Sequence, residues 1–213
     1  METAELSKLI KTRRSIRLFQ DKPVPEALLV QAIEIATWAP NGANKQNWRF
    51  FIIIDKKVIN AIGDAIEASG EIILSWPEMS NTGLPSFRPL ALDTAAALIV
   101  VAFSRSINNP MDDAIAKRAK TDPKARQIFE GRQIVNWQVQ STSAAVAYLL
   151  LVLHQMGLGS VWMTGSLYAK ADIEKVLRLP LDLDVVTLIP VGYPAENPTK
   201  SRKPVNEVCE VIK

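Results

Sequence analysis

Apolar and polar positions along the chain form two kinds of segment. In the first kind, apolar residues follow one another over a short stretch, which is typical of strands buried on both faces of a sheet. Such runs dominate residues 49–54, 96–103 and 185–191, and a shorter strand is expected over residues 161–163. The run at 96–103 is apolar throughout, so we expect that strand to lie at the centre of its sheet.

In the second kind of segment, apolar residues recur every three or four positions, which indicates helices with one buried face. Helices are expected over residues 4–12, 25–38, 56–69 and 169–178, with a charged helical region after the Asn109-Pro110 turn. Gly70 is expected to end the third of these helices, because glycine is favoured just after a helix.

The longest helix is expected from about residue 134 to residue 156, where Gly157 ends it. Its second half is apolar on every side, so we expect it to be buried all round. Because a single small domain rarely hides such a rod alone, this helix predicts a dimer interface. His154 lies on the rod, where a lone histidine is more often a packed or hydrogen-bonded core residue than a base or a ligand.

Two segments fit neither pattern. Residues 40–48 form a loop dense in amide side chains, and this loop leads directly into the first strand. Residues 70–92 are irregular because prolines and a glycine interrupt them. Long segments of that kind are usually lids, binding loops or mobile excursions. A length of 213 residues predicts one domain of ordinary core size, with two small ones as the alternative. We expect a single domain over residues 1–213 with an irregular excursion at about 70–92.

The composition is that of a folded protein. Of the 213 residues, 48% are apolar and 22% are charged, whereas disordered chains are poorer in apolar residues. Cys209 is the single cysteine, which excludes an intramolecular disulfide and suits a reducing compartment. The N-terminus lacks the features of a signal peptide, and the longest apolar run, residues 144–153, is too short to span a bilayer. We therefore expect a soluble, cytoplasmic protein with no membrane partner.

The net charge of +3 and the pI near 9.0 are too mild to indicate nucleic-acid binding, which usually requires a dense basic stripe. The most basic stretch, residues 117–126, is interleaved with carboxylates at Asp112, Asp113, Asp122 and Glu130. A solvated helix face explains it better, and no nucleic-acid partner is expected.

Two basic clusters lie near opposite ends of the chain: residues 13–17 (RRSIR) and residues 200–203 (KSRK). Arginine presents planar pairs of donors that match phosphate oxygens, and serine adds a donor that can rotate. Each cluster alone is more often a solvated charged face. Together they could clamp one anionic group if the two ends of the chain converge.

Several other chemistries find no support in the sequence. No Cys/His cluster has metal-ligand spacing, and His154 would have to serve any Ser-His or Cys-His pair. No phosphate-binding GxxxxGK[ST] stretch is present, and the glycines of residues 157–160 follow a helix, in the wrong order for a dinucleotide fingerprint. Thr164-Gly165 is expected to leave backbone N–H groups free for a ligand. What remains is an anion clamp without a strong base, which suits a protein whose cofactor carries the chemistry.

Four stretches, in this order and at this spacing, resemble the nitroreductase family of FMN-dependent oxidoreductases over nearly the whole chain. They are residues 13–17 (RRSIR), 39–48 (APNGANKQNW), 157–165 (GLGSVWMTG) and 191–194 (VGYP), the last leading to KSRKP at 200–204. The resemblance implies an α+β fold in which helices flank a mixed, mainly antiparallel sheet. It also implies an intertwined homodimer with FMN sites at the dimer interface.

The resemblance also implies roles for individual residues. By position, Arg13, Lys200 and Arg202 are similar to the family's phosphate ligands. Arg14 and Ser15 match its partners for phosphate and ribityl, and Arg17 resembles the basic residue near the flavin pyrimidine. The remaining matches are the loop that reaches the flavin from the other subunit (Pro40, Asn41, Gly42 and Asn44) and the segment that faces the ring (Met163, Thr164 and Gly165).

The sequence departs from the family pattern in the amide-rich loop. Many members carry Pro-Ser or Ser-Ser where Asn41-Gly42 stands, and many carry proline where Asn47 stands. These departures bear on substrate fit more than on FMN binding.

The activity that the resemblance implies is ping-pong oxidoreduction. NAD(P)H would pass hydride to flavin N5, and a small-molecule electron acceptor such as a nitroaromatic or a quinone would then take two electrons. No side chain is expected to be catalytic. Trp76, Met79 and Phe87 are candidates for the wall of the substrate slot, although core packing is the default for such residues. A nonredox flavin-binding or flavin-consuming member of the same fold, and a nucleic-acid-binding module, remain alternatives.

Overall fold

The computed structural model describes residues 2–79, 88–107 and 109–212. Its sheet has four strands in the order β1-β2-β4-β3, and every neighbouring pair is antiparallel. The strands are β1 (Trp48–Ile53), β2 (Ala97–Ser104), β3 (Gly159–Ser160) and β4 (Leu183–Gly192). The expected α+β fold with a mainly antiparallel sheet is therefore confirmed. A parallel contact occurs only as an isolated bridge between Ser15 and Ser160 among the described residues, so the four-stranded sheet is not mixed.

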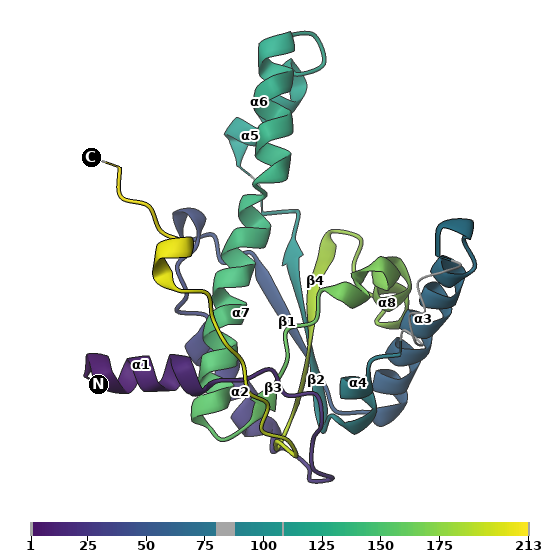
Figure 1. Cartoon of the computed structure of the whole chain (residues 1–213). Coiled ribbons are helices and arrows are strands. Elements are labelled where there is room, and N and C mark those ends of the chain that lie inside the picture. The colour runs from purple at the N-terminus through teal and green to yellow at the C-terminus, as the bar shows by residue number, and fades with distance from the viewer. Residues whose placement is uncertain (1, 80–87, 108, 213) are drawn as a thin grey trace.

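The two central strands are buried on both faces because helices cover both sides of the sheet (Figure 1). Alternate residues of a strand point to opposite faces. On β2, Ile99 and Val101 pack with the helices of one face, whereas Leu98 and Val100 pack with those of the other. This two-sided burial explains the unbroken apolar runs from which the strands were predicted.

The helices of the first face are α2 (Glu26–Ala36) and α7 (Trp137–Gln155). The helices of the second face are α3 (Lys56–Leu74), α4 (Leu90–Thr94) and α8 (Lys170–Val176). Short 3-10 turns occupy Gly42–Asn44, Pro77–Met79, Gly165–Ala169 and Val205–Glu207. Within the described residues, none of the helices is both long and apolar enough to cross a membrane.

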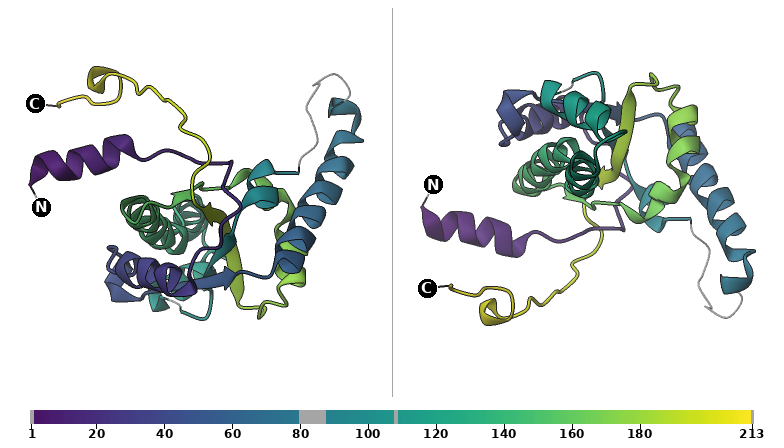
Figure 2. Two further views of the ribbon diagram at one scale, coloured as in Figure 1. Left: turned by 90° about the horizontal axis from the view of Figure 1, so that it is seen from below. Right: turned by 90° about the horizontal axis from the view of Figure 1, so that it is seen from above.

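Three helices stand away from these layers. The pair α5 (Pro110–Arg118) and α6 (Pro123–Ile134) projects beyond one end of the sheet (Figure 1). Helix α1 (Thr3–Thr12) has no buried residue and leaves the body on the same side as the C-terminal tail (Figure 2). The two chain ends therefore lie on one side of the molecule.

Both ends are tied to one edge of the sheet. The amide of Ile16 donates to Ser160 O in β3 at 3.0 Å, and that of Ala195 donates to Leu18 O at 2.9 Å. Residues 15–20 are therefore held between β3 and the first residues of the C-terminal tail. The close approach depends on Gly192, where an added Cβ would lie 2.9 Å from the side chain of Phe19.

Two predicted helix boundaries were wrong. The long helix does not begin at residue 134: α6 ends at Ile134, and α7 begins at Trp137 because the Asn136 side chain accepts from the amides of Gln138 and Val139. This is the hydrogen-bonding pattern of an N-cap. Helix α3 does not stop at Gly70 but continues to Leu74. Gly70 is buried within it, so tertiary packing outweighs the low helix propensity of glycine.

The expected position of the short strand also needs correction. The short strand is Gly159–Ser160 rather than residues 161–163, and Met163 makes only an isolated bridge to Leu188. Helix α7 is not covered on every side within one chain, since Tyr148 is 43% exposed, so its expected burial all round, which includes a dimer interface, stays a prediction. The proline- and glycine-interrupted stretch includes the end of α3, a 3-10 turn at Pro77–Met79 and the start of α4, while residues 80–87 lie outside the described residues.

Replacing Gly192 with alanine is expected to destabilise the protein by about 1–3 kcal/mol, the usual cost of overpacking a tight site. The new Cβ would meet the Phe19 side chain, which is buried. Thermal or denaturant unfolding measures the effect. Gly131→Ala in α6 is the matched control, because nothing lies within 4 Å of its Cβ position. That substitution should be neutral or stabilising, and equal effects of the two would contradict the close approach.

Candidate functional site

A small pocket forms where the two basic clusters meet. Its volume is about 150 Å³, and it is lined by Arg13, Arg14, Ser15, Arg17, Pro198, Lys200 and Arg202. We call it the cationic pocket. Residues nearly two hundred positions apart thus share one cavity, which is the convergence on which the clamp hypothesis depends.

The pairing of residues 15–20 with the tail explains this convergence. Gln20 donates its amide to Tyr193 O at 2.9 Å and its side-chain Nε2 to Pro194 O at 2.8 Å. Phe19 forms an antiparallel bridge with Pro194. Because this pairing runs toward the basic residues on both segments, it delivers Lys200 and Arg202 to Arg13.

The cationic pocket is lined by five positively charged residues, Arg13, Arg14, Arg17, Lys200 and Arg202. Within the described residues, no ion pair forms at Arg13, Arg17, Lys200 or Arg202. Burial lowers the pKa of Arg13, and the neighbouring guanidiniums of Arg202 and Arg14 lower it further. Arginine stays protonated in proteins despite such shifts, so Arg13 carries a partly buried charge that two neighbouring like charges repel. A bound anion would relieve that repulsion.

A larger and mostly apolar pocket adjoins the cationic one. Its volume is about 480 Å³, within the usual range for small-molecule sites. We call it the apolar pocket. Its lining consists of Arg17, Pro89, Leu90, Ala91, Val161, Trp162, Met163, Thr164, Gly165, Ser166 and Tyr168. Arg17 lines both pockets, so one elongated ligand could place a charged end in the first and a flat apolar body in the second.

The predicted ring-facing segment supplies the polar groups of the apolar pocket. Met163 is fixed by reciprocal backbone hydrogen bonds with Leu188, and its carbonyl also accepts from Thr187 Oγ1 at 2.8 Å. After this residue the chain leaves the sheet. The amides of Thr164 and Gly165 have no protein acceptor among the described residues. As expected from the sequence, they are available to a ligand.

The amide-rich loop lies elsewhere. Neither pocket is lined by Pro40, Asn41, Gly42 or Asn44. Gly42 instead lines a separate hollow of about 230 Å³ beside Trp137, and its amide donates to Ser141 Oγ of α7 at 3.2 Å. A single chain therefore does not bring this loop to the other predicted site residues.

The same loop is locally strained. Ala43, Asn44 and Gln46 all have positive φ, at 52°, 52° and 46°. This region is unfavourable for residues other than glycine and is tolerated mainly by asparagine. The conformation is held by Asn41 Oδ1, which accepts from the Gln46 amide at 2.9 Å. Strained backbone of this kind gathers at functional sites, so the loop is a candidate for contact with a ligand or with a second chain.

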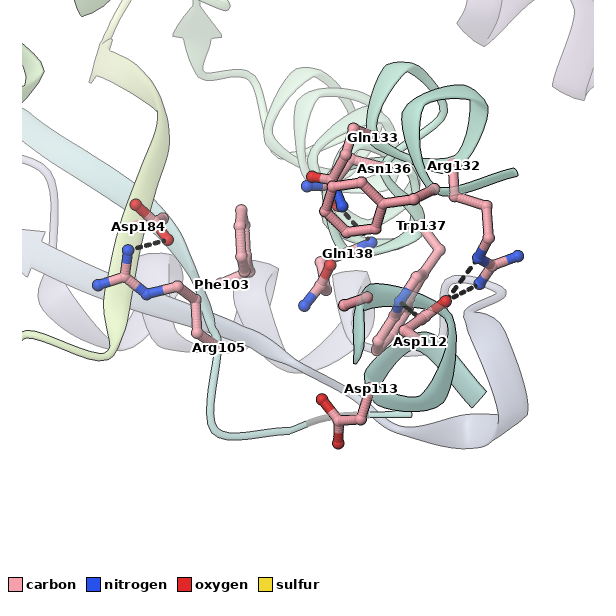
Figure 3. Close-up of a pocket in the computed structure, with 12 residues that line it drawn as sticks. Phe103, Arg105, Asp112, Asp113, Arg132, Gln133, Asn136, Trp137, Gln138 and Asp184 are labelled. Carbon is pink, nitrogen blue, oxygen red and sulfur yellow. Dashed lines mark hydrogen bonds and ion pairs between the residues drawn. The ribbon is translucent and has the colours of Figure 1, made fainter. Parts of the chain in front are cut away.

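Another cavity, of about 400 Å³, lies where α5 and α6 join the end of the sheet (Figure 3). Several of its charged groups form ion pairs or hydrogen bonds with one another. Arg105 contacts Asp184 at 3.1 Å, and Asp112 accepts from both Arg132 and Trp137 Nε1. The contacts of Asp112 thus tie α5 to α6 and to the start of α7, whereas the Arg105–Asp184 pair joins the ends of β2 and β4. Among the described residues, no group of His, Cys, Asp and Glu side chains is arranged to hold a metal ion.

Sequence reasoning missed part of the lining. Pro89, Leu90 and Tyr168 line the apolar pocket, yet ordinary core residues have the same types and no motif marks them. The described lining does not include Trp76 or Met79, which were candidates for the wall of the slot, and Phe87 lies outside the described residues.

His154 lies beside the cationic cluster rather than deep in the core. Its Nε2 is 3.0 Å from Thr12 Oγ1, and the Thr12 hydroxyl is 2.8 Å from Lys8 O. Because the single hydroxyl proton points to that carbonyl, Nε2 donates to Thr12. The expectation of a hydrogen-bonded histidine is met. Burial lowers the pKa of His154, and the guanidiniums of Arg13 and Arg14 lower it further.

We expect the His154 imidazole in the folded protein to titrate below its ordinary value of about 6.5. The unfolded chain then takes up this proton at a higher pH than the folded chain does. Folding stability should therefore fall as the pH drops from about 6.5 through the folded pKa. His154 is the single histidine in the sequence, so its NMR signal is unambiguous.

The role of the guanidiniums is tested by Arg13→Gln, which should raise the pKa of His154 toward its ordinary value. Arg178→Gln, just after α8 on the other face of the sheet, is the control and should leave it unchanged. A wild-type pKa at or above the ordinary value would contradict this electrostatic description.

Comparisons with known proteins agree with this geometry. A sequence profile of the Nitroreductase family matches residues 10–193. An NADH dehydrogenase of Thermus thermophilus is 30% identical over 86% of this chain and 84% of that protein. The crystal structure of a BluB-like flavoprotein from Clostridium difficile 630 superposes with a TM-score of 0.82 at 28% identity, and the match covers 100% of both chains. The structure of an oxidised iodotyrosine deiodinase bound to FMN and 3-iodo-L-tyrosine superposes with a TM-score of 0.70 at 26% identity over 98% of both chains. This chain belongs to the nitroreductase family.

Proposed function

We propose that this protein is an FMN-dependent oxidoreductase that uses NAD(P)H as the electron donor. The observation that carries the proposal is that Arg17 lines both the cationic pocket and the apolar pocket. FMN has a phosphate at one end and a flat tricyclic ring at the other, so its shape and charge suit this pair of cavities. When bound, FMN would supply two-electron hydride transfer from NAD(P)H to an acceptor, which this chain's own side chains do not supply.

The cationic pocket would hold the phosphate. Arg13, Lys200 and Arg202 would donate directly, and Arg14 and Ser15 would assist. Each charge-assisted hydrogen bond is worth about 1.5–3 kcal/mol. Three of them would supply roughly half or more of the ~8 kcal/mol that micromolar retention needs. The mutual repulsion of the unliganded guanidiniums adds to the preference for a dianion.

The apolar pocket would hold the ring. The amides of Thr164 and Gly165 would donate to its polar edge, with Met163 beside them, and Arg17 would place a positive charge beside the flavin pyrimidine. Positive charge favours the reduced ring, on which negative charge develops. None of these residues needs to act as an acid or a base, because the reaction depends on alignment of the rings.

The remaining site residues would come from a second copy of the chain. Trp38, at the end of α2, is 84% exposed, and Val30 and Ile35 of the same helix are about half exposed. Tyr148 is exposed on α7. Large apolar side chains exposed on two helices that pack together are typical of an interface between subunits. A homodimer would cover these side chains and would bring the strained loop, with Pro40, Asn41, Gly42 and Asn44, to the flavin of its partner.

Two acceptor classes have support. A nitroaromatic or quinone is favoured by the family to which the chain belongs. A halogenated tyrosine is the second candidate, since a deiodinase structure with FMN and 3-iodo-L-tyrosine matches 98% of this chain. Steady-state oxidation of NADH and NADPH with each acceptor separates these cases, and the absence of turnover with all of them would favour a nonredox or flavin-consuming member.

The purified protein should show flavin absorbance or acquire it when FMN is added. Arg202→Ala should loosen FMN by about tenfold or more, because it removes a donor worth at least ~1.4 kcal/mol. Lys203→Ala is the matched control: it removes the same charge from the next residue, which does not line the cationic pocket. Quenching of flavin fluorescence measures both affinities. A wild-type protein that binds no FMN would end the proposal, and equal effects of the two substitutions would remove Arg202 from the clamp.

Trp38→Glu should weaken the dimer, because it would bury a charge in the proposed interface. Size-exclusion chromatography with light scattering should show a shift toward monomer, accompanied by weaker flavin retention. Leu181→Glu, at a position that is 92% exposed between α8 and β4, is the control. A wild-type protein that is monomeric at micromolar concentration would contradict the interface.

A further inference from the structure

A carboxylate lies among the positive charges that surround the cationic pocket. Glu196 Oε1 accepts from the backbone amide of Arg17 and from that of Leu18, the latter at 3.2 Å. Successive amides that converge in this way form a concavity for an anion. This carboxylate would repel a bound phosphate, so its presence calls for an explanation.

The position of Glu196 along the tail gives one. Within the described residues up to 212, no residue after Glu196 makes a hydrogen bond to the body of the chain. Among the described residues Glu196 is therefore the last hydrogen-bonded attachment of the tail to the body, and Lys200 and Arg202 follow it by four and six residues. Glu196 accepts a hydrogen bond from the backbone amide of Arg17, a residue that lines the cationic pocket. The Glu196 side chain thus links the first basic cluster directly to the tail that carries Lys200 and Arg202.

We propose that Glu196 is a positioning residue that holds Lys200 and Arg202 against residues 13–17, so that the phosphate of FMN meets a preorganised set of donors. This inference rests on the proposed FMN function. Ordering a tail when the ligand binds would cost conformational entropy. Glu196 fixes the near end of the tail before the ligand arrives, and the gain in preorganisation outweighs the repulsion between its charge and the phosphate.

Two substitutions separate the gain from preorganisation of the tail from the repulsion between Glu196 and the phosphate. Glu196→Ala removes both the acceptor and the charge, and we expect it to weaken FMN binding by about tenfold. Glu196→Gln keeps an acceptor oxygen but removes the charge, so FMN should bind as tightly as to the wild type or more tightly. Glu207→Ala is the matched control, because it removes a carboxylate from the same tail beyond the clamp, and it should change the affinity by less than about twofold.

Two further measurements show that Glu196 acts through the phosphate donors. Riboflavin lacks the phosphate, so Glu196→Ala should leave its affinity unchanged. In an Arg202→Ala background, Glu196→Ala should lose much of its effect, because contacts in one network are not additive. A general loss of structure would instead weaken both ligands equally and add to the Arg202 effect.

A readout without flavin tests the anchor itself. Trypsin cleaves after Lys200 and after Arg202, and the tail should be cut faster in Glu196→Ala than in Glu196→Gln or Glu207→Ala. Circular dichroism establishes that the variants are folded. Should the alanine variant fail to fold, Glu196→Asp provides the test, because it keeps the charge but shortens the reach and should also weaken FMN binding.

The outcomes distinguish the two proposals. A wild-type protein that binds neither FMN nor riboflavin overturns the proposed function and this inference with it. A wild-type protein that binds FMN, combined with an alanine variant that binds it equally or more tightly, overturns the role of Glu196 alone. Equal weakening of FMN and riboflavin also overturns that role.

Discussion

The structure depends on one interaction, the pairing of residues 15–20 with the start of the C-terminal tail beside β3. Ala195 donates to Leu18 O and Gln20 to Tyr193 O, and these bonds bring guanidinium groups from both chain ends together. This arrangement is electrostatically unfavourable, since burial lowers the pKa of Arg13 and the like charges of Arg202 and Arg14 lower it further. Backbone hydrogen bonds and the burial of Ile16 and Phe19 hold the segment in place against that repulsion. The positive charges that the fold holds together therefore favour a negatively charged ligand.

Much of the fold could be predicted from the sequence because both faces of the central strands are covered. A strand that is buried on both faces is apolar throughout, as in residues 96–103, so it can be recognised in the sequence. The pairing of one strand with another has no such signal. Val161 is buried against Ile16 and Phe19 rather than in a ladder, and for this reason the short strand was misplaced. The break before α7 followed from a hydrogen bond of Asn136, which the apolar periodicity could not reveal.

The site could be predicted only in part for a related reason. Guanidiniums and a hydroxyl in RRSIR have few uses apart from solvation and anion binding, so Arg13 and Arg17 stand out. Pro89 and Tyr168 do not, because nothing in their type or spacing differs from packing residues. Glu196 was missed since a lone carboxylate beside a basic stretch suggests charge balance rather than a backbone contact. Its function is visible only when the amides of Arg17 and Leu18 are placed next to it.

Because Gly159 and Gly192 have no side chain, residues 15–20 can lie close against the sheet. An added Cβ at either position would lie 2.9 Å from Ile16 or Phe19, so the thickness of one methyl group determines how far the arginine-bearing segment stands from the sheet. A larger residue there would push the arginine-bearing segment away from the sheet without altering any of its cations. The capacity of the molecule to grip an anion is thus governed partly by residues that carry no charge and touch no ligand.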